Sequence, residues 1–409
     1  MNKTMQLFFL ILFPFYPFWA WSLFLFTHTP IGVFLTLIFI PIAFYSLITS
    51  RINLPKYLLF FMLFTFYHLC SVYINNLVPS GSNWYKFLLS DMNVQACVLF
   101  FVIENTHFEE KFIRKMNRNI FFIVLISLLV SLLQIRYPSF FVSPNLTDNI
   151  DNVIYFSQGR IPSIYSWVDL NSLGITFPIL IAILLSFFSH KKMTFPLIVI
   201  SGMVVSFLTK ARYVILSAII VFSQLFFISK IKLRKKVYIL LIFTGSVVIL
   251  LSVAKVIGFD IQQVINDRIL EKSTDMGSAN ARIISYYVFL AKFPEHPMIG
   301  VGPETKLDVL LLLGEGIPLI HVGYLSYLYF YGLVGCFFLF LSMFFLLRDA
   351  WIVGRKYEFW GGFYGLLSFC FANTTLVYFN FSEMGIILVI IYLRYYNEKS
   401  SLELSTLKL

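Results

Sequence analysis

The chain has 409 residues, of which 59% are hydrophobic and only 12% are charged. Its mean hydropathy is +0.83, whereas a soluble globular protein usually has about 25% charged residues. The net charge of +11 lies in short basic clusters between apolar blocks, a pattern that favours membrane orientation over nucleic-acid binding. Composition therefore predicts an all-α, polytopic membrane protein, with residues 1–409 as a single integral membrane domain.

Apolar blocks of membrane-spanning length recur along the whole chain. A helix needs about 20 apolar residues to cross roughly 30 Å of hydrocarbon, where its backbone must satisfy its own hydrogen bonds. We expect about 12 transmembrane helices, at residues 6–26, 31–49, 57–75, 86–104, 119–135, 167–188, 195–209, 213–229, 237–257, 322–347, 359–378 and 383–397.

Lys and Arg are distributed unequally between alternate loops. With the N-terminus in the cytoplasm, 20 of the 31 Lys and Arg fall in the cytoplasmic loops and tails, and residues 230–236 form the densest cluster. Basic loops tend to stay on the cytoplasmic side of a membrane. The bias therefore predicts an inner-membrane protein with both termini in the cytoplasm.

Two cations stand in a very short outer connection, because only Lys210, Ala211 and Arg212 separate two predicted spans. Such side chains often extend to the membrane interface without any further function. The positive-inside bias disfavours cations on the outer face, however. A guanidinium also suits a phosphate, since its planar fork makes paired charged hydrogen bonds. We therefore expect Arg212 to bind an anionic group.

Two outer segments, 136–166 and 258–321, are longer than ordinary helix connections, which favours a functional role for them. In the larger segment, a periplasmic loop by the orientation above, Ala279–Lys292 has the apolar spacing of an amphipathic helix that lies against the membrane. Leu307–Leu313 is compatible with a further short helix. This ordered content predicts binding or chemistry on the outer face.

Three features of the large loop carry polar chemistry. Arg282 lies in the amphipathic stretch, where a single cation is most often a solvated surface charge. Pro294–Glu304 is rich in Pro and Gly, which predicts an irregular turn that exposes backbone amides to an anion, although glycines alone are weak evidence. His321 directly precedes a span. An imidazole there is usually an interfacial residue, but it can also act as a general base near neutral pH.

The order of these motifs resembles that of the O-antigen polymerase and O-antigen ligase superfamily. In that family an SR or TR element begins a span, an Arg-led amphipathic helix runs into a P-x-x-G-x-G turn, and a His opens a span carrying G-L-x-G. The similar stretches here are Leu208–Tyr213, Ala281–Pro303 and His321–Gly335, with Gly159–Gly174 a looser match. The resemblance implies catalytic roles for Arg212, Arg282 and His321, and substrate-binding roles for Arg160 and Asn171. Lys210, within the first of these stretches, and Glu304, directly after the second, are further candidates for substrate binding.

The resemblance implies a membrane-embedded glycosyltransferase of the C type, independent of metals and other cofactors, in the bacterial inner membrane. Its substrates would be undecaprenyl-pyrophosphate-linked oligosaccharides at the periplasmic face, for lipopolysaccharide or capsule, and it would have no nucleic-acid partner. Arg212 and Arg282 would stabilise the pyrophosphate leaving group. His321 would activate the acceptor hydroxyl or contact the phosphate. A chain-length regulator and a flippase are compatible partners.

Three alternatives remain open at this stage. Ligases of the superfamily usually have Asn, Ser or Gln after the His, and Val322 at this position favours the polymerase over the ligase. Asp169, Glu304 and Glu383 are outer-boundary carboxylates that could act as the base in place of His321. A transporter of lipid-linked oligosaccharides is disfavoured, because the two halves of the chain show neither an internal repeat nor charges in the middle of the spans.

Overall fold

The computed structural model describes residues 2–27, 31–49, 52–75, 84–142, 160–167, 170–188, 191, 193–227, 234, 237, 241, 245, 278–303, 320, 322–376, 379 and 381–406. Every regular element in this part of the chain is a helix, which confirms the all-α fold. Most of the predicted span 237–257 and much of the loop 258–321 lie outside the described residues, as does the short helix predicted at Leu307–Leu313.

The predicted first span is bent. Helices α1 (Asn2–Leu12) and α2 (Tyr16–Thr27) meet at an angle of 79°. The next two predicted spans correspond within one residue to α3 (Ile31–Thr49) and α4 (Lys56–Ile74). Continuous apolar composition thus locates helices well but does not reveal a sharp bend between two of them.

An acidic residue interrupts the span predicted at 86–104. Helix α5 (Trp84–Ser90) stops before Asp91, and α6 (Met92–Glu104) starts after it. Asp91 caps α6, because its Oδ1 accepts hydrogen bonds from the backbone amides of Asn93 (3.0 Å) and Val94 (2.9 Å). The first amides of a helix have no partner within it, so a capping carboxylate stabilises the new start.

The described residues in the middle of the chain form four α-helices and one short 3-10 helix. Helix α7 (Glu110–Arg136) is followed by the 3-10 helix η1 (Ser163–Trp167) and by α10 (Leu170–Phe188). Helices α11 (Thr194–Leu208) and α12 (Arg212–Phe227) then form the predicted tight hairpin.

The C-terminal part begins with α15 (Ser278–Lys292), the amphipathic helix predicted in the large loop, followed by the 3-10 helix η3 (Phe293–Glu295). The described residues after this turn form three helices: α17 (Gly323–Tyr357), α18 (Trp360–Ala372) and α19 (Met384–Thr406).

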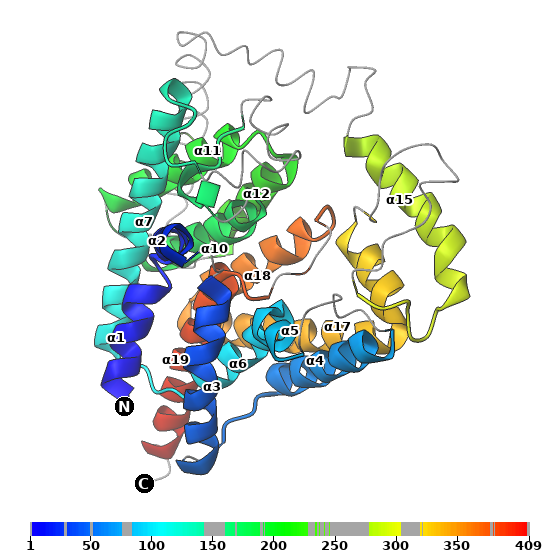
Figure 1. Ribbon diagram of the computed structural model, residues 1–409. Coiled ribbons are helices and arrows are strands. Elements are labelled where there is room, and N and C mark those ends of the chain that lie inside the picture. The colour runs from blue at the N-terminus through cyan, green and yellow to red at the C-terminus, as the bar shows by residue number, and fades with distance from the viewer. Residues whose placement is uncertain are drawn as a thin grey trace.

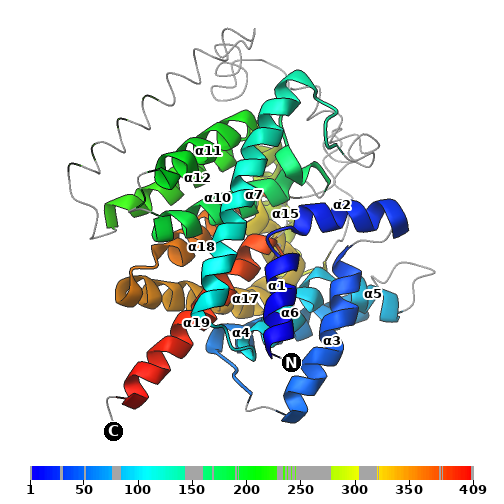
Figure 2. The ribbon, with the colours of Figure 1, turned by 90° about the vertical axis from the view of Figure 1, so that its left-hand side faces the viewer.

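Helix α10 occupies the centre of the molecule and packs against α7, α11, α12, α18 and α19. A second group forms around α17, which packs along α4 and α18. The helices are not one parallel bundle, because α7 runs steeply in both views whereas α17 runs across the molecule (Figures 1 and 2). The apolar core is continuous through both groups.

Helices α4, α7 and α17 are each long and apolar enough to cross a membrane, and the bent α1–α2 pair would add a fourth span. Six further apolar helices in the described part of the chain are shorter, with 10–17 residues. These helices agree with a transmembrane protein. The count of twelve spans stays a prediction.

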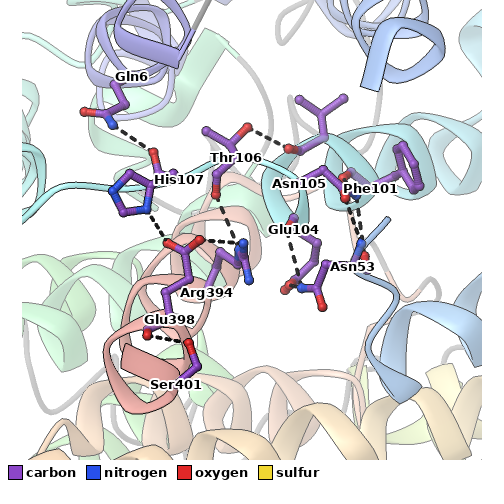
Figure 3. A network of polar contacts seen from close by, with 11 residues as sticks. Gln6, Asn53, Phe101, Glu104, Asn105, Thr106, His107, Arg394, Glu398 and Ser401 are labelled. Carbon is purple, nitrogen blue, oxygen red and sulfur yellow. Dashed lines mark hydrogen bonds and ion pairs between the residues drawn. The ribbon is translucent and has the colours of Figure 1, made fainter. Parts of the chain in front are cut away.

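Both termini lie at the same end of the molecule (Figures 1 and 2). A polar network ties α19 to the α6–α7 connection there (Figure 3). Arg394 donates to Glu398 at 2.6 Å, and Glu398 also pairs with His107 at 2.9 Å. Beside them the carboxylate of Glu104 accepts a hydrogen bond from the side-chain amide of Asn53 at 2.9 Å. Which side of the membrane this end faces stays a prediction.

Candidate functional site

The α11–α12 hairpin carries two of the predicted site residues. Lys210 has a φ of +51°, in the left-handed region that non-glycine residues seldom adopt. Thr209 braces the turn, since its hydroxyl donates to the carbonyl of Ser206 at 2.7 Å and accepts from the amide of Ala211 at 3.3 Å. Arg212 is the first residue of α12. Backbone strain of this kind often accompanies functional sites.

Arg160 lies beside this hairpin. The amide of the next residue, Ile161, donates to the carbonyl of Leu208 at 3.2 Å, so the chain around Arg160 runs along the end of α11. Three residues further on, Ser163 is fixed to α7, because its amide donates to Gln134 Oε1 at 2.9 Å. Arg160 is partly exposed, with its Nε atom buried.

The first turns of α10 connect the hairpin to a buried carboxylate. The Tyr213 ring packs so closely on Gly174 that a Cβ there would lie 2.4 Å from it. Around the helix from Gly174, Ser172 and Thr176 donate hydrogen bonds to the two carboxylate oxygens of Glu383, at 2.8 and 3.3 Å. Residues two apart point to nearly opposite sides of a helix. Tyr213 and Glu383 therefore flank the start of α10 on different sides.

Four of the seven predicted site residues thus lie on elements that meet around the N-terminal end of α10. Asn171 is the second residue of that helix, and Arg160, Lys210 and Arg212 belong to the neighbouring segments. The N-terminal end of a helix has a partial positive charge and unbonded amides, so it adds to the attraction that these cations exert on an anion.

Glu383 precedes α19 and is only 6% exposed. Its carbonyl accepts hydrogen bonds from the amides of Ile386 and Ile387, so the residue also caps this helix. Tyr165 of η1 lies within its electrostatic reach: burial first, and then the negative charge of Glu383, raise the pKa of the Tyr165 phenol. The phenol therefore keeps its proton at working pH.

Arg282 lies away from the hairpin, on a helix with an apolar outer face. Among its described residues, the large exposed apolar side chains of α15 are Ile283, Tyr286, Tyr287 and Leu290, each at least 50% exposed. Arg282 shares the inner face with buried Ser285 and Phe289, which follow it by three and seven residues, and its Nε atom is buried. Helix α15 packs on α17 and η3, and Figure 1 shows it apart from α11 and α12.

The glycine-rich turn after α15 fills a break in α17. Gly332 has φ +61° and ψ −168°, a conformation that essentially only glycine adopts, and α17 is interrupted there. In the break, the amides of Val301 and Gly302 donate to the carbonyls of Tyr329 (3.1 Å) and Phe330 (2.9 Å). The expectation that this turn exposes its amides to an anion is therefore wrong for Val301 and Gly302.

Hydrogen bonds also run from α17 back to the turn, and α4 adds one more. The amides of Leu333 and Val334 donate to the carbonyls of Pro297 (2.9 Å) and Met298 (3.1 Å). The Tyr67 hydroxyl of α4 donates to the carbonyl of Ile299 at 2.8 Å. The turn thus satisfies backbone groups that the broken helix would otherwise leave unpaired, and it fixes the chain that follows α15.

His321 and Glu304 lie outside the described residues, so their predicted roles stay predictions. Val322, the position that separates this chain from typical ligases, is the N-cap residue of α17 and makes no side-chain capping bond. Asn or Ser would be able to cap the helix at this position.

A buried polar chain beside the break has no counterpart in the predicted site. His68 of α4 pairs through Nδ1 with the Tyr331 hydroxyl (2.9 Å) and through Nε2 with Asp91 Oδ2 (2.7 Å). His68 and Tyr331 are 4% and 3% exposed. Because the three residues are far apart in the sequence, their spacing offers no signal; only their polarity within apolar blocks marks them.

Within the described residues, no three His, Cys, Asp or Glu side chains are grouped as metal ligands. Metal independence stays a prediction.

Residues 196–340 match the family model of O-antigen ligase. No curated protein matches the chain. The matched region runs from α11 to the middle of α17, and it includes the hairpin, α15 and the turn that docks at Gly332. The match supports the O-antigen polymerase and ligase superfamily, whose members are glycosyltransferase-like enzymes of O-antigen assembly.

Proposed function

We propose that this chain is a polysaccharide polymerase of the bacterial inner membrane. The proposal starts from its O-antigen ligase family domain, which supports the O-antigen polymerase and ligase superfamily. The enzyme transfers an undecaprenyl-pyrophosphate-linked glycan onto an incoming lipid-linked repeat unit at the periplasmic face. The observation that carries this proposal is the grouping of Arg160, Lys210 and Arg212 around the start of α10.

These cations suit a diphosphate leaving group. As the bond to the sugar breaks, negative charge builds up on the phosphate oxygen, and the guanidinium of Arg212 can stabilise it through paired hydrogen bonds. The positive end of α10 adds to this effect. Removing one such preorganised contact typically lowers the rate by on the order of 10²–10³.

The separate position of Arg282 fits the two diphosphates that a polymerase reaction involves. A polymerase binds two carrier lipids at once, and each one brings a diphosphate. Arg282 lies on the inner face of α15, whose outer face offers Tyr286, Tyr287 and Leu290 to an apolar environment. Tyrosines of this kind are enriched at membrane interfaces. We assign the hairpin cations to the donor diphosphate and Arg282 to that of the acceptor.

Ligase is the second candidate, and Val322 bears on it. Val322 is the N-cap residue of α17. The polar residue that ligases have at this position could therefore serve to cap the helix. The two functions differ in the phenotype of a deletion strain. Loss of a polymerase leaves lipid A core with a single repeat unit, whereas loss of a ligase leaves bare core and polymer on the carrier lipid.

The test is complementation of the deletion strain, scored by lipopolysaccharide banding. Arg212→Ala, Arg282→Ala and His321→Ala should each abolish long chains while the protein remains in the membrane. Arg114→Ala is the matched control: this arginine of α7 is 75% exposed and paired only with its helix neighbour Glu110 in the described structure. Normal banding in all three site variants, or bare core in the deletion strain, would refute the polymerase proposal.

A further inference from the structure

We propose that Glu383 is the general base that takes the proton from the acceptor sugar hydroxyl, and that Tyr165 binds the same hydroxyl. This inference rests on the proposed function and assigns a residue to its proton-transfer step. The cations keep their proposed role of binding the diphosphate groups.

A buried carboxylate at this position needs a physical explanation. Removing a charge from water is costly, and ionisable side chains inside membrane proteins usually mark functional sites. The ionised form of Glu383 is supported by hydrogen bonds from Ser172 (2.8 Å) and Thr176 (3.3 Å). It also stands at the positive end of α19. These contacts stabilise an ionised carboxylate in a place shielded from water.

Tyr165 provides the second, independent observation. Its ring is 1% exposed, and its hydroxyl is buried without a hydrogen-bond partner in the described structure. Unsatisfied buried hydroxyls are uncommon and call for an explanation. A protonated phenol within the electrostatic reach of a carboxylate can act with it as a donor–acceptor pair. A sugar hydroxyl between them accepts from Tyr165 and donates to Glu383, which satisfies the orphan group.

The same short segment that carries Tyr165 reaches the cations. Ile161 is hydrogen-bonded to the end of α11, and Tyr165 follows it by four residues. Even a fully extended chain spans at most about 14 Å over four residues. An acceptor sugar at Tyr165 and Glu383 therefore lies within reach of a donor whose diphosphate is held at the hairpin.

The transfer step balances without any further reactant. The acceptor oxygen attacks the anomeric carbon of the donor sugar, and its proton passes to the carboxylate of Glu383. The bond between the anomeric carbon and the phosphate oxygen breaks, and its electron pair leaves with undecaprenyl pyrophosphate. Arg212 stabilises the charge that this leaving group acquires.

The experiment uses the full-length protein in lipid vesicles, with lipid-linked repeat units extracted from the deletion strain as substrate. Glu383→Gln preserves shape and the backbone cap of α19, and it should lower kcat by on the order of 10²–10⁴, the usual size of a general-base contribution. Substrate binding should change little. The wild-type rate should fall on acidification, as the carboxylate becomes protonated, and the residual rate of Glu383→Gln should lack this dependence.

Tyr165→Phe keeps the test decisive if Glu383→Gln does not fold. It removes only a hydroxyl without a hydrogen bond to any described residue, so the fold should be unchanged while KM for the acceptor rises about tenfold. The control is Glu104→Gln, a buried carboxylate at the opposite end that accepts from Tyr57 at 2.6 Å. This variant should keep the wild-type pH profile.

The outcomes separate the two proposals. A wild-type protein that lengthens no lipid-linked glycan refutes the proposed function itself. An active wild type refutes only the role of Glu383 if Glu383→Gln stays within a few-fold of its rate or retains the acid dependence. An unchanged KM in Tyr165→Phe likewise refutes the proposed binding of the acceptor hydroxyl.

Discussion

Replacing Gly332 with alanine should detach the glycine-rich turn from α17. A Cβ at this position would lie 2.4 Å from the carbonyl oxygen of Met298 and 2.6 Å from the amide nitrogen of Gly300. Both are backbone atoms and cannot rotate away. The backbone conformation itself, φ +61° and ψ −168°, costs a non-glycine residue about 1–3 kcal/mol.

The size of the effect follows from the contacts that would be lost. Four backbone hydrogen bonds join the turn to α17, and each contributes about 0.5–1.5 kcal/mol net. Undocking therefore costs about 2–6 kcal/mol. Part of this is recovered because alanine favours a continuous helix over glycine by about 0.5–1 kcal/mol. Together with the strain of about 1–3 kcal/mol in the docked state, this gain should shift the equilibrium toward the undocked turn by at least an order of magnitude.

Hydrogen exchange of the purified protein, followed by mass spectrometry, measures this directly. The amides of Val301 and Gly302 bond to carbonyls across the break, so their exchange should accelerate at least tenfold in Gly332→Ala. Gly362→Ala in α18 is the matched control, since its new Cβ would meet side-chain atoms of Phe359 and Leu393 at 3.2 Å or more. Exchange near Val301 should be unchanged in that control.

A double variant makes the reasoning refutable. Gly300 packs on the other side of the same contact, where a Cβ would lie 2.3 Å from the carbonyl oxygen of Phe330. Both glycines support the same contact, so the second substitution should add less than its own single effect to the first. Unchanged exchange in Gly332→Ala, or fully additive effects in the double variant, would show that the two glycines do not support one docking contact.

Two further predictions concern stability, measured as the thermal unfolding midpoint in detergent. His68→Leu leaves both Asp91 and Tyr331 without their shared partner and should lower the free energy of unfolding by about 2–4 kcal/mol. Tyr331→Phe should lower it by only about 0.5–1.5 kcal/mol. A larger loss in Tyr331→Phe than in His68→Leu would contradict the role of the buried polar chain. Arg394→Ala removes a half-buried pair with Glu398 and should cost about 1.5–3 kcal/mol. His107→Ala, whose side chain is 53% exposed, should cost less than about 1 kcal/mol. Equal losses in these two variants would refute this view of the network.

The helices themselves follow from local composition. Predicted and observed bounds agree within one residue for α3, α4 and α11, and the amphipathic helix α15 begins one residue before its prediction. Two interruptions were missed. At Asp91 a charged residue within an apolar block was a usable signal, since such a residue prefers an N-cap to a helix interior. The bend between α1 and α2 left no comparable mark in their apolar composition.

The candidate site was also predicted only in part from the sequence. Family motifs pointed to Arg160, Asn171 and Arg212, which meet around α10 together with Lys210, but they did not reveal that Arg282 lies apart from these residues. The break at Gly332 depends on a turn about 30 residues earlier in the chain. Its four hydrogen bonds exist only in the folded protein.

The sequence by itself determined that this chain is helical and membrane-embedded, because a helix closes its backbone hydrogen bonds within four residues and lipid offers no alternative. Only the tertiary structure decided which polar groups share a buried environment. Glu383 accepts a hydrogen bond from Ser172, which is 211 residues distant in the sequence. His68 is hydrogen-bonded to Tyr331, at a separation of 263 residues. The cost of burying a polar group depends on the partners that packing brings to it, and no local pattern encodes them.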